Sequence, residues 1–141
     1  MRSSFAYRRR VESGTQNPVE TLESRSGSCR DYALLMMEAA RSLGFAARFV
    51  SGYLYDERLI GGGSERLVGG GETHAWVQIY LPGAGWVEFD PTNALIGGKN
   101  LIRVAVTRDP SQAIPVSGTF TGLTGAFQGM EVEVQVTADP D

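Results

Sequence analysis

One stretch of the sequence, residues 28–44, has the spacing of a buried helix. Its apolar residues recur at helical intervals, Ser28 is suited to cap the amino end, and Gly44 is suited to end the helix. Further apolar residues lie beside the main stripe. We therefore expect this helix to be buried on most sides and to occupy the centre of the fold.

The segments after this helix have the patterns of strands. Residues 47–54 form a strand-like run, and residues 101–107 and 130–137 alternate apolar and polar side chains. Residues 74–81 and 86–90 flank a short turn that contains proline and glycine, which is typical of a hairpin. The C-terminal half is therefore predicted to be antiparallel sheet.

The length of 141 residues is enough for one domain with its own hydrophobic core. We interpret residues 1–21 as an irregular lead-in that Phe5 and Tyr7 anchor. The glycine-rich residues 61–71 are interpreted as a flexible connection, with a lid over the functional site as the alternative. Residues 1–141 are expected to form a single domain that is a fragment of a larger protein.

The composition argues against several classes of function. The net charge is −3, and the basic residues cluster only at 8–10, so nucleic acid is not an expected partner. No apolar run reaches the roughly 18 residues of a membrane helix, and no signal peptide is evident, so we expect no membrane association and a cytoplasmic location. One cysteine and one histidine exclude an internal disulfide and a zinc site of four such ligands, and no metal or other cofactor is expected.

The single cysteine, Cys29, lies in the first turn of the predicted helix. Unsatisfied N–H groups and the helix dipole favour a thiolate at this place, and the thiolate is the nucleophilic form of cysteine. The alternative is a small buried apolar residue, because free cysteines are among the most buried residue types. The position alone does not decide between the two interpretations.

The hairpin brings the single histidine toward a carboxylate. If Leu81 pairs with Gly85, Trp76 lies opposite Asp90, and His74 is the diagonal neighbour of Asp90 on the same face. Thiol catalysis requires a nucleophile, a base and a group that orients the base, and Cys29, His74 and Asp90 supply one each. The alternatives are a structural histidine and an aspartate that caps the turn after residue 90.

Four motifs in this order resemble those of the transglutaminase-like superfamily, and most closely its bacterial branch of transglutaminase-like cysteine peptidases. They are RSGSCRDYA at 25–33, ARFVSGY at 47–53, THAWV at 73–77 and GWVEFDPT at 85–92. The resemblance covers roughly residues 20–107. Ser28 departs from the apolar residue that commonly precedes the cysteine, and the glycine-rich segment before His74 is unusually long.

The resemblance implies a papain-like α+β core in which the cysteine helix packs on an antiparallel sheet. It implies that Cys29 is the nucleophile, His74 the acid and base, and Asp90 the orienting carboxylate. Bacterial relatives often carry a further domain before this core. An upstream domain of the same protein is therefore an expected partner, and in one interpretation it completes the cleft.

Three aromatic residues near these motifs are candidates for supporting roles. Tyr53 is a speculative donor near the oxyanion, and Trp76 and Trp86 are candidates to wall the cleft, although core packing is the simpler interpretation of all three. The backbone N–H of Cys29 is the best candidate for one oxyanion donor.

The function predicted from these residues is thiol-dependent hydrolysis of a carboxamide in a peptide or protein substrate, through a thioester acyl-enzyme. Two alternatives are open. An amine instead of water makes the same three residues a transglutaminase, and a non-catalytic peptide-binding or scaffold module keeps only the fold.

Overall fold

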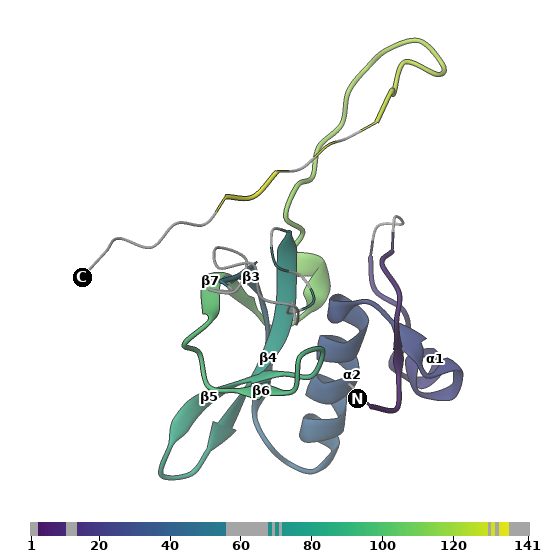
Figure 1. Cartoon of the computed structure of the whole chain (residues 1–141). Coiled ribbons are helices and arrows are strands. Elements are labelled where there is room, and N and C mark those ends of the chain that lie inside the picture. Colours follow the sequence, from purple (N-terminus) through teal and green to yellow (C-terminus); the bar gives the residue numbers. More distant parts are fainter. Residues whose placement is uncertain are drawn as a thin grey trace, which may run out of the picture.

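The computed structural model describes residues 3–10, 14–55, 68, 70, 72–129, 131 and 133–135, and in it a helix packs on an antiparallel sheet. The sheet has five strands in the order β6-β5-β4-β3-β7. Helix α2 (Cys29–Ser42) lies against it (Figure 1). The α+β fold with the cysteine helix on the sheet is therefore confirmed. The strands are β3 (Ala47–Leu54), β4 (Thr73–Leu81), β5 (Gly85–Asp90), β6 (Leu95–Ile96) and β7 (Leu101–Thr107).

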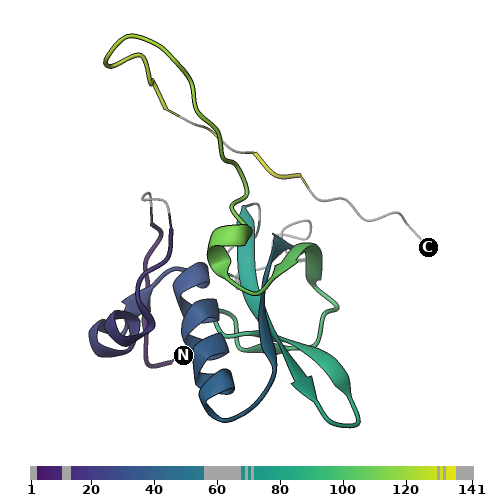
Figure 2. The ribbon, with the colours of Figure 1, turned by 180° about the vertical axis from the view of Figure 1, so that it is seen from behind.

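The core lies on both faces of the sheet. Helix α2 packs along β3 and β4, as the view from behind shows (Figure 2), and Met37, Phe49 and Val77 are fully buried between them. Alternate residues of the same strands form a second cluster with the start of β7, and its members are Val50, Leu54, Trp76 and Leu101. Because both faces of β3 are covered, buried residues follow one another along this strand instead of alternating with exposed ones.

The ends of α2 fix its direction along the sheet. At the amino end, the Asp31 carboxylate accepts hydrogen bonds of 2.8 Å from both the backbone N–H and the hydroxyl of Ser28. At the carboxyl end, Gly44 has a positive φ of 87°, which glycine adopts readily, and Arg41 donates to the Ala47 carbonyl. Ala47 pairs with Ile79 near the end of β4, so Cys29 lies toward the start of β4.

Residues 1–21, which we interpret from the sequence as an irregular lead-in, contain two short regular elements where the structure describes them. A two-residue strand β1 (Ala6–Tyr7) pairs in parallel with β2 (Ser26–Gly27), and helix α1 (Pro18–Ser24) begins inside the segment. Asn17 caps α1 by accepting from the backbone N–H of Val19 at 2.9 Å. The helix has no apolar stripe to reveal it, because Val19 and Leu22 are exposed and Thr21 is its buried residue.

The C-terminal segment also differs from the prediction. After β7, a short 3₁₀ helix η1 (Pro110–Gln112) packs at α2, where Arg30 donates to the Pro110 and Ala113 carbonyls, and the following residues run away from the sheet (Figure 1). The strand predicted over 130–137 is absent at its described residues, 131 and 133–135. Alternation alone does not make a strand, because the backbone also needs a neighbouring strand to pair with.

Two further findings concern expectations from the sequence. The glycine-rich residues 61–71, interpreted as a connection or lid, lie outside the described residues, apart from residues 68 and 70. Within the described residues, the helices are too short or too polar to span a bilayer.

Candidate active site

The β4–β5 hairpin has the predicted register. Leu81 pairs with Gly85 and Tyr80 pairs with Trp86, which confirms the expected turn. His74 Nε2 lies 2.8 Å from Asp90 Oδ2, and both residues are 1% exposed. The hairpin therefore brings the histidine and the carboxylate into direct contact inside the protein.

Asp90 both partners His74 and caps the turn that follows it. Its Oδ1 accepts from the backbone N–H of Thr92 at 2.9 Å and of Asn93 at 3.3 Å, and its Oδ2 also accepts from the Asn93 side chain at 2.8 Å. Burial raises the pKa of Asp90, but the hydrogen bonds from His74 and Asn93 outweigh it and hold the pKa below its usual value. Asp90 is therefore a fixed carboxylate at neutral pH.

His74 is held as an imidazolium at neutral pH. Burial lowers the pKa of His74, but its interactions with Asp90 and Cys29 outweigh burial and raise the pKa to about 9. The second ring nitrogen, Nδ1, is buried and has no hydrogen bond to any described residue. Because Nε2 is engaged by Asp90, Nδ1 is the ring nitrogen that remains open to a further partner.

Cys29 is the first residue of α2 and is buried. It is 7% exposed and belongs to the apolar cluster under the helix, as a packing residue would. It is also one of the groups that raise the pKa of His74, so its side chain lies in the neighbourhood of the imidazole. Cys29, His74 and Asp90 therefore lie in one region of the fold, and the direct contact among them is that of His74 with Asp90.

Tyr7 is a neighbour of Cys29 that the sequence analysis identified only as an anchor. Tyr7 pairs with Gly27 just before the cysteine, and its ring packs edge-on against Tyr32 of α2, with 6.4 Å between centroids. Burial raises the pKa of the Tyr7 hydroxyl, and Cys29 raises it further. No local pattern could have revealed this contact, because the two residues are far apart in the sequence.

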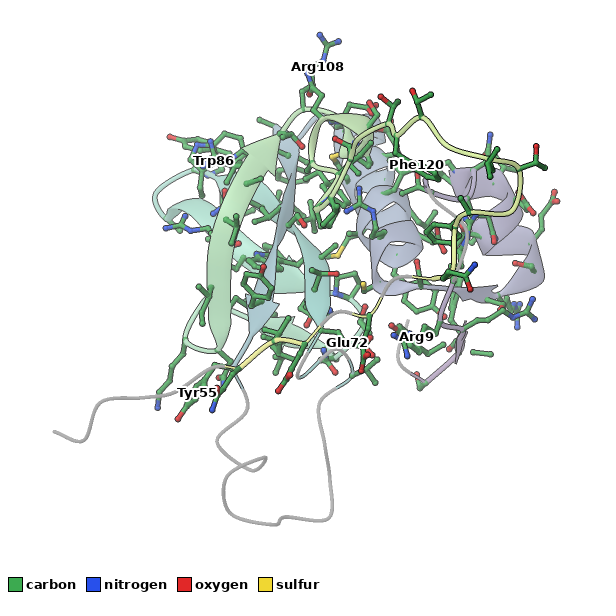
Figure 3. The ribbon with its side chains drawn as sticks, turned by 90° about the horizontal axis from the view of Figure 1, so that it is seen from above. Arg9, Tyr55, Glu72, Trp86, Arg108 and Phe120 are labelled. Atoms are coloured by element: carbon green, nitrogen blue, oxygen red, sulfur yellow. The ribbon has the colours of Figure 1, made fainter. Side chains whose placement is uncertain are left out.

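The segment that carries Tyr7 also reaches the histidine side of the site. Arg9 Nη2 lies 3.0 Å from Glu72 Oε1, just before β4 begins, and Figure 3 shows the two side chains close together. On the other side, Tyr32 donates to the Ala6 carbonyl at 2.6 Å. The segment therefore runs from the cysteine helix to the start of the histidine strand.

Of the three aromatic residues predicted to have supporting roles, one contacts the His74–Asp90 pair. Trp76 is fully buried and stacks on His74, with 6.1 Å between centroids and 27° between ring planes. Tyr53 pairs with Thr73, alternates away from the face of Gly52 and His74, and makes no hydrogen bond to the triad among the described residues. Trp86 is 40% exposed under the Arg48 guanidinium, and Figure 3 shows it far from Glu72.

A comparison with models of protein families identifies the family to which this chain belongs. The model of the transglutaminase-like superfamily matches residues 1–91. The chain belongs to this superfamily. The resemblance seen in the four motifs is thereby confirmed. The described part of this superfamily member has no group of three His, Cys, Asp or Glu side chains arranged to hold a metal ion.

Relatives of this superfamily member are found in several bacteria. An uncharacterized protein of Mycobacterium leprae is 35% identical over 84% of the chain, and one of Mycobacterium tuberculosis is 32% identical over 94%. A protein-glutamine gamma-glutamyltransferase of Pseudomonas aeruginosa is 41% identical over 50% of the chain. The chain covers 40%, 43% and 10% of these three proteins, so it matches only part of each.

A solved structure shares the fold. The crystal structure of a candidate cysteine protease from Cytophaga hutchinsonii superimposes with a TM-score of 0.62 and 26% identity. The match covers 79% of this chain and 34% of that protein. The superfamily fold therefore occurs in a solved protein with a related sequence.

Proposed function

We propose that this chain is a thiol-dependent amide hydrolase or peptidase that works through a Cys29–His74–Asp90 triad. One observation carries the proposal: the buried His74 ring is held by Asp90 through Nε2, while Nδ1 has no other hydrogen bond among the described residues and Cys29 lies beside the ring. A purely structural histidine would satisfy both ring nitrogens.

In the proposed reaction, the Cys29 sulfur attacks the carbonyl carbon of a carboxamide. The C–N bond then breaks, and the leaving ammonia or amine takes a proton from His74 Nδ1, which leaves a thioester on Cys29. Water attacks the thioester carbon as His74 takes its proton, and the C–S bond then breaks, which releases the acid and returns Cys29 to its thiolate form. Asp90 keeps the imidazole in one orientation and stabilises its charged form. The Cys29 backbone N–H and the Tyr7 hydroxyl are the proposed donors near the developing oxyanion.

The raised pKa of His74 predicts the alkaline limit of the reaction. The imidazolium that protonates the leaving amine is present at neutral pH and is lost as the pH rises through about 9. We expect the rate of amide cleavage to fall with an apparent pKa near 9 in a pH series measured with a glutamine-containing peptide. The ion pair of His74 with Asp90 also stabilises the fold. Its contribution is fully present at a pH below the ordinary histidine pKa of about 6.5, and it is lost as the pH rises through the raised pKa of His74.

The control for this pH series is Asp90→Asn. Hydrogen bonding to Asp90 raises the pKa of His74, so its loss should move the alkaline limit to lower pH. An unchanged limit in the variant would show that another group controls it.

Water and an amine compete as acceptors in the second step. Identity to a protein-glutamine gamma-glutamyltransferase supports transfer to an amine as the second candidate function. The test is intact-mass analysis of glutamine peptides incubated with the protein, with and without a primary amine. A mass gain of about 1 Da, from conversion of amide to acid, supports hydrolysis, and incorporation of the amine supports transfer.

The whole protein's substrates and partners belong to this proposal as well. We propose a peptide or protein carboxamide as the substrate and an upstream domain of the same protein as a partner, because the chain covers 40% of its Mycobacterium leprae relative. A domain whose cleft needs that partner would show a reactive Cys29 without turnover. The cytoplasmic location also stays a prediction.

A further inference from the structure

A second carboxylate stands beside the triad and takes no part in the proposed reaction. Glu88 lies on β5 opposite Gln78 and two residues before Asp90, so the two carboxylates point to the same face. Glu88 is 8% exposed. Burying a charged carboxylate is unfavourable unless hydrogen bonds compensate, and an apolar side chain would fill such a position at lower cost.

Both buried donors to Glu88 come from β4. The Trp76 indole N–H donates to Glu88 Oε2 at 2.5 Å, and the Gln78 amide donates to Glu88 Oε1 at 2.6 Å. The Gln78 oxygen in turn accepts from Arg48 Nε at 2.6 Å. The Arg103 guanidinium lies 3.5 Å from Oε1 but is 54% exposed, so it contributes little. The carboxylate is therefore satisfied mainly by two neutral donors.

The contact between Trp76 and Glu88 resembles that between His74 and Asp90, two residues away along each strand of the hairpin. On β4, His74 and Trp76 each direct a ring nitrogen at a carboxylate of β5, His74 at Asp90 and Trp76 at Glu88. The two rings stack on each other. On its far edge, the indole covers Gly52, where an added Cβ would lie 2.9 Å from Trp76 Cη2. Trp76 is thus fixed at its nitrogen, its edge and its stacked face.

We propose that Glu88 is a positioning residue for the triad: it holds the Trp76 indole against His74, and so keeps the imidazole between Asp90 and Cys29. This inference rests on the proposed function. The pKa of His74 is raised by Asp90 and Cys29, so the role proposed for Glu88 is one of position. Its effect is transmitted through the indole.

The test measures thioester formation on Cys29 in a single turnover by intact mass. Glu88→Gln keeps the size of the side chain but offers one oxygen to two donors, so we expect the rate to fall about tenfold. Trp76→Phe removes the indole N–H and should lower the rate by a similar factor. Because both changes act on one contact, the double variant should be no slower than the slower single variant. Glu38→Gln changes an exposed carboxylate on α2 and should leave the rate unchanged.

A reciprocal exchange separates positioning from simple loss of stability. In the double variant Glu88→Gln and Gln78→Glu, the introduced amide can accept from Trp76 and donate to the introduced carboxylate, which can accept from Arg48. All three buried hydrogen bonds are retained, and we expect the rate to return to within threefold of the original. Near-UV circular dichroism at the assay temperature shows which variants are folded, and only the rates of folded variants are compared.

Several outcomes would overturn the inference. The first two are a rate of thioester formation equal to that of the unmodified protein in folded Glu88→Gln or in folded Trp76→Phe. The third is an additive loss when Glu88→Gln and Trp76→Phe are combined. The fourth is an exchange variant, Glu88→Gln with Gln78→Glu, that is folded but as slow as Glu88→Gln. If Glu88→Gln does not fold, Trp76→Phe and the exchange variant decide. If the unmodified protein forms no thioester and its Cys29 reacts with iodoacetamide no faster than a free thiol, the proposed function itself fails.

Discussion

Replacing His74 by alanine is expected to lower the rate of thioester formation on Cys29 by about 10⁴- to 10⁶-fold, the range of losses when one member of such a triad is removed. The variant lacks both the charge that stabilises a neighbouring thiolate and the proton donor for the leaving amine. Iodoacetamide labelling of Cys29 should slow sharply at neutral pH for the first of these reasons. Both rates are measured by intact mass.

The matched control for His74 is Tyr80→Ala. Tyr80 lies on the same strand and the same face, but it packs on Trp86 at the other end of the hairpin and is 45% exposed. This variant should keep the original rates. Labelling at the rate of a free thiol in both the unmodified protein and His74→Ala would instead favour a non-catalytic module.

Gly52→Ala is expected to destabilise the fold by at least about 3 kcal/mol, at the upper end of the range for overpacked cores. An added Cβ would lie 2.0 Å from the backbone oxygen of Ile102, and a backbone atom cannot move aside as the end of a side chain can. Strand β7 would have to separate from β3 at the register shift between Ser51 and Gly52. Denaturant unfolding followed by circular dichroism measures the free energy of unfolding.

Gly118→Ala is the control for this prediction. An added Cβ at Gly118 would have no heavy atom of the described residues within 4 Å, so the free energy of unfolding should change little. Because Gly52 pairs with His74, the folded fraction of Gly52→Ala should also show slower labelling of Cys29. A loss of stability below about 1 kcal/mol would mean that the two strands can separate at this point without disturbing the core.

The hairpin shows how far local patterns can predict a site. The turn between β4 and β5 is short, so the pairing of Leu81 with Gly85 sets every later pair, and alternation then puts His74 and Asp90 on one face. The helix that begins at Cys29 was predicted from its capping residues and apolar spacing in the same way. These features depend on residues that are close in the sequence.

Other features depend on contacts that no local pattern contains. Helix α1 has an Asn cap and a proline in its first turn, but it lacks the buried stripe by which helices are recognised. Residues 133–135 alternate like a strand but pair with no strand among the described residues. Trp86 and Trp76 occupy the same face of one hairpin, yet Trp86 is exposed and Trp76 is buried.

The sequence by itself determined the cysteine helix, the hairpin register and the pairing of His74 with Asp90, because helix caps, turn length and alternation act over a few residues. Only the tertiary structure decided that Tyr7 lies at Cys29, that Tyr53 and Trp86 lie away from the triad, and that Glu88 is buried against Trp76. Packing between segments that are distant in the chain decides which faces of the helices and strands are buried. The pattern of a single segment holds no information about the segment that packs against it.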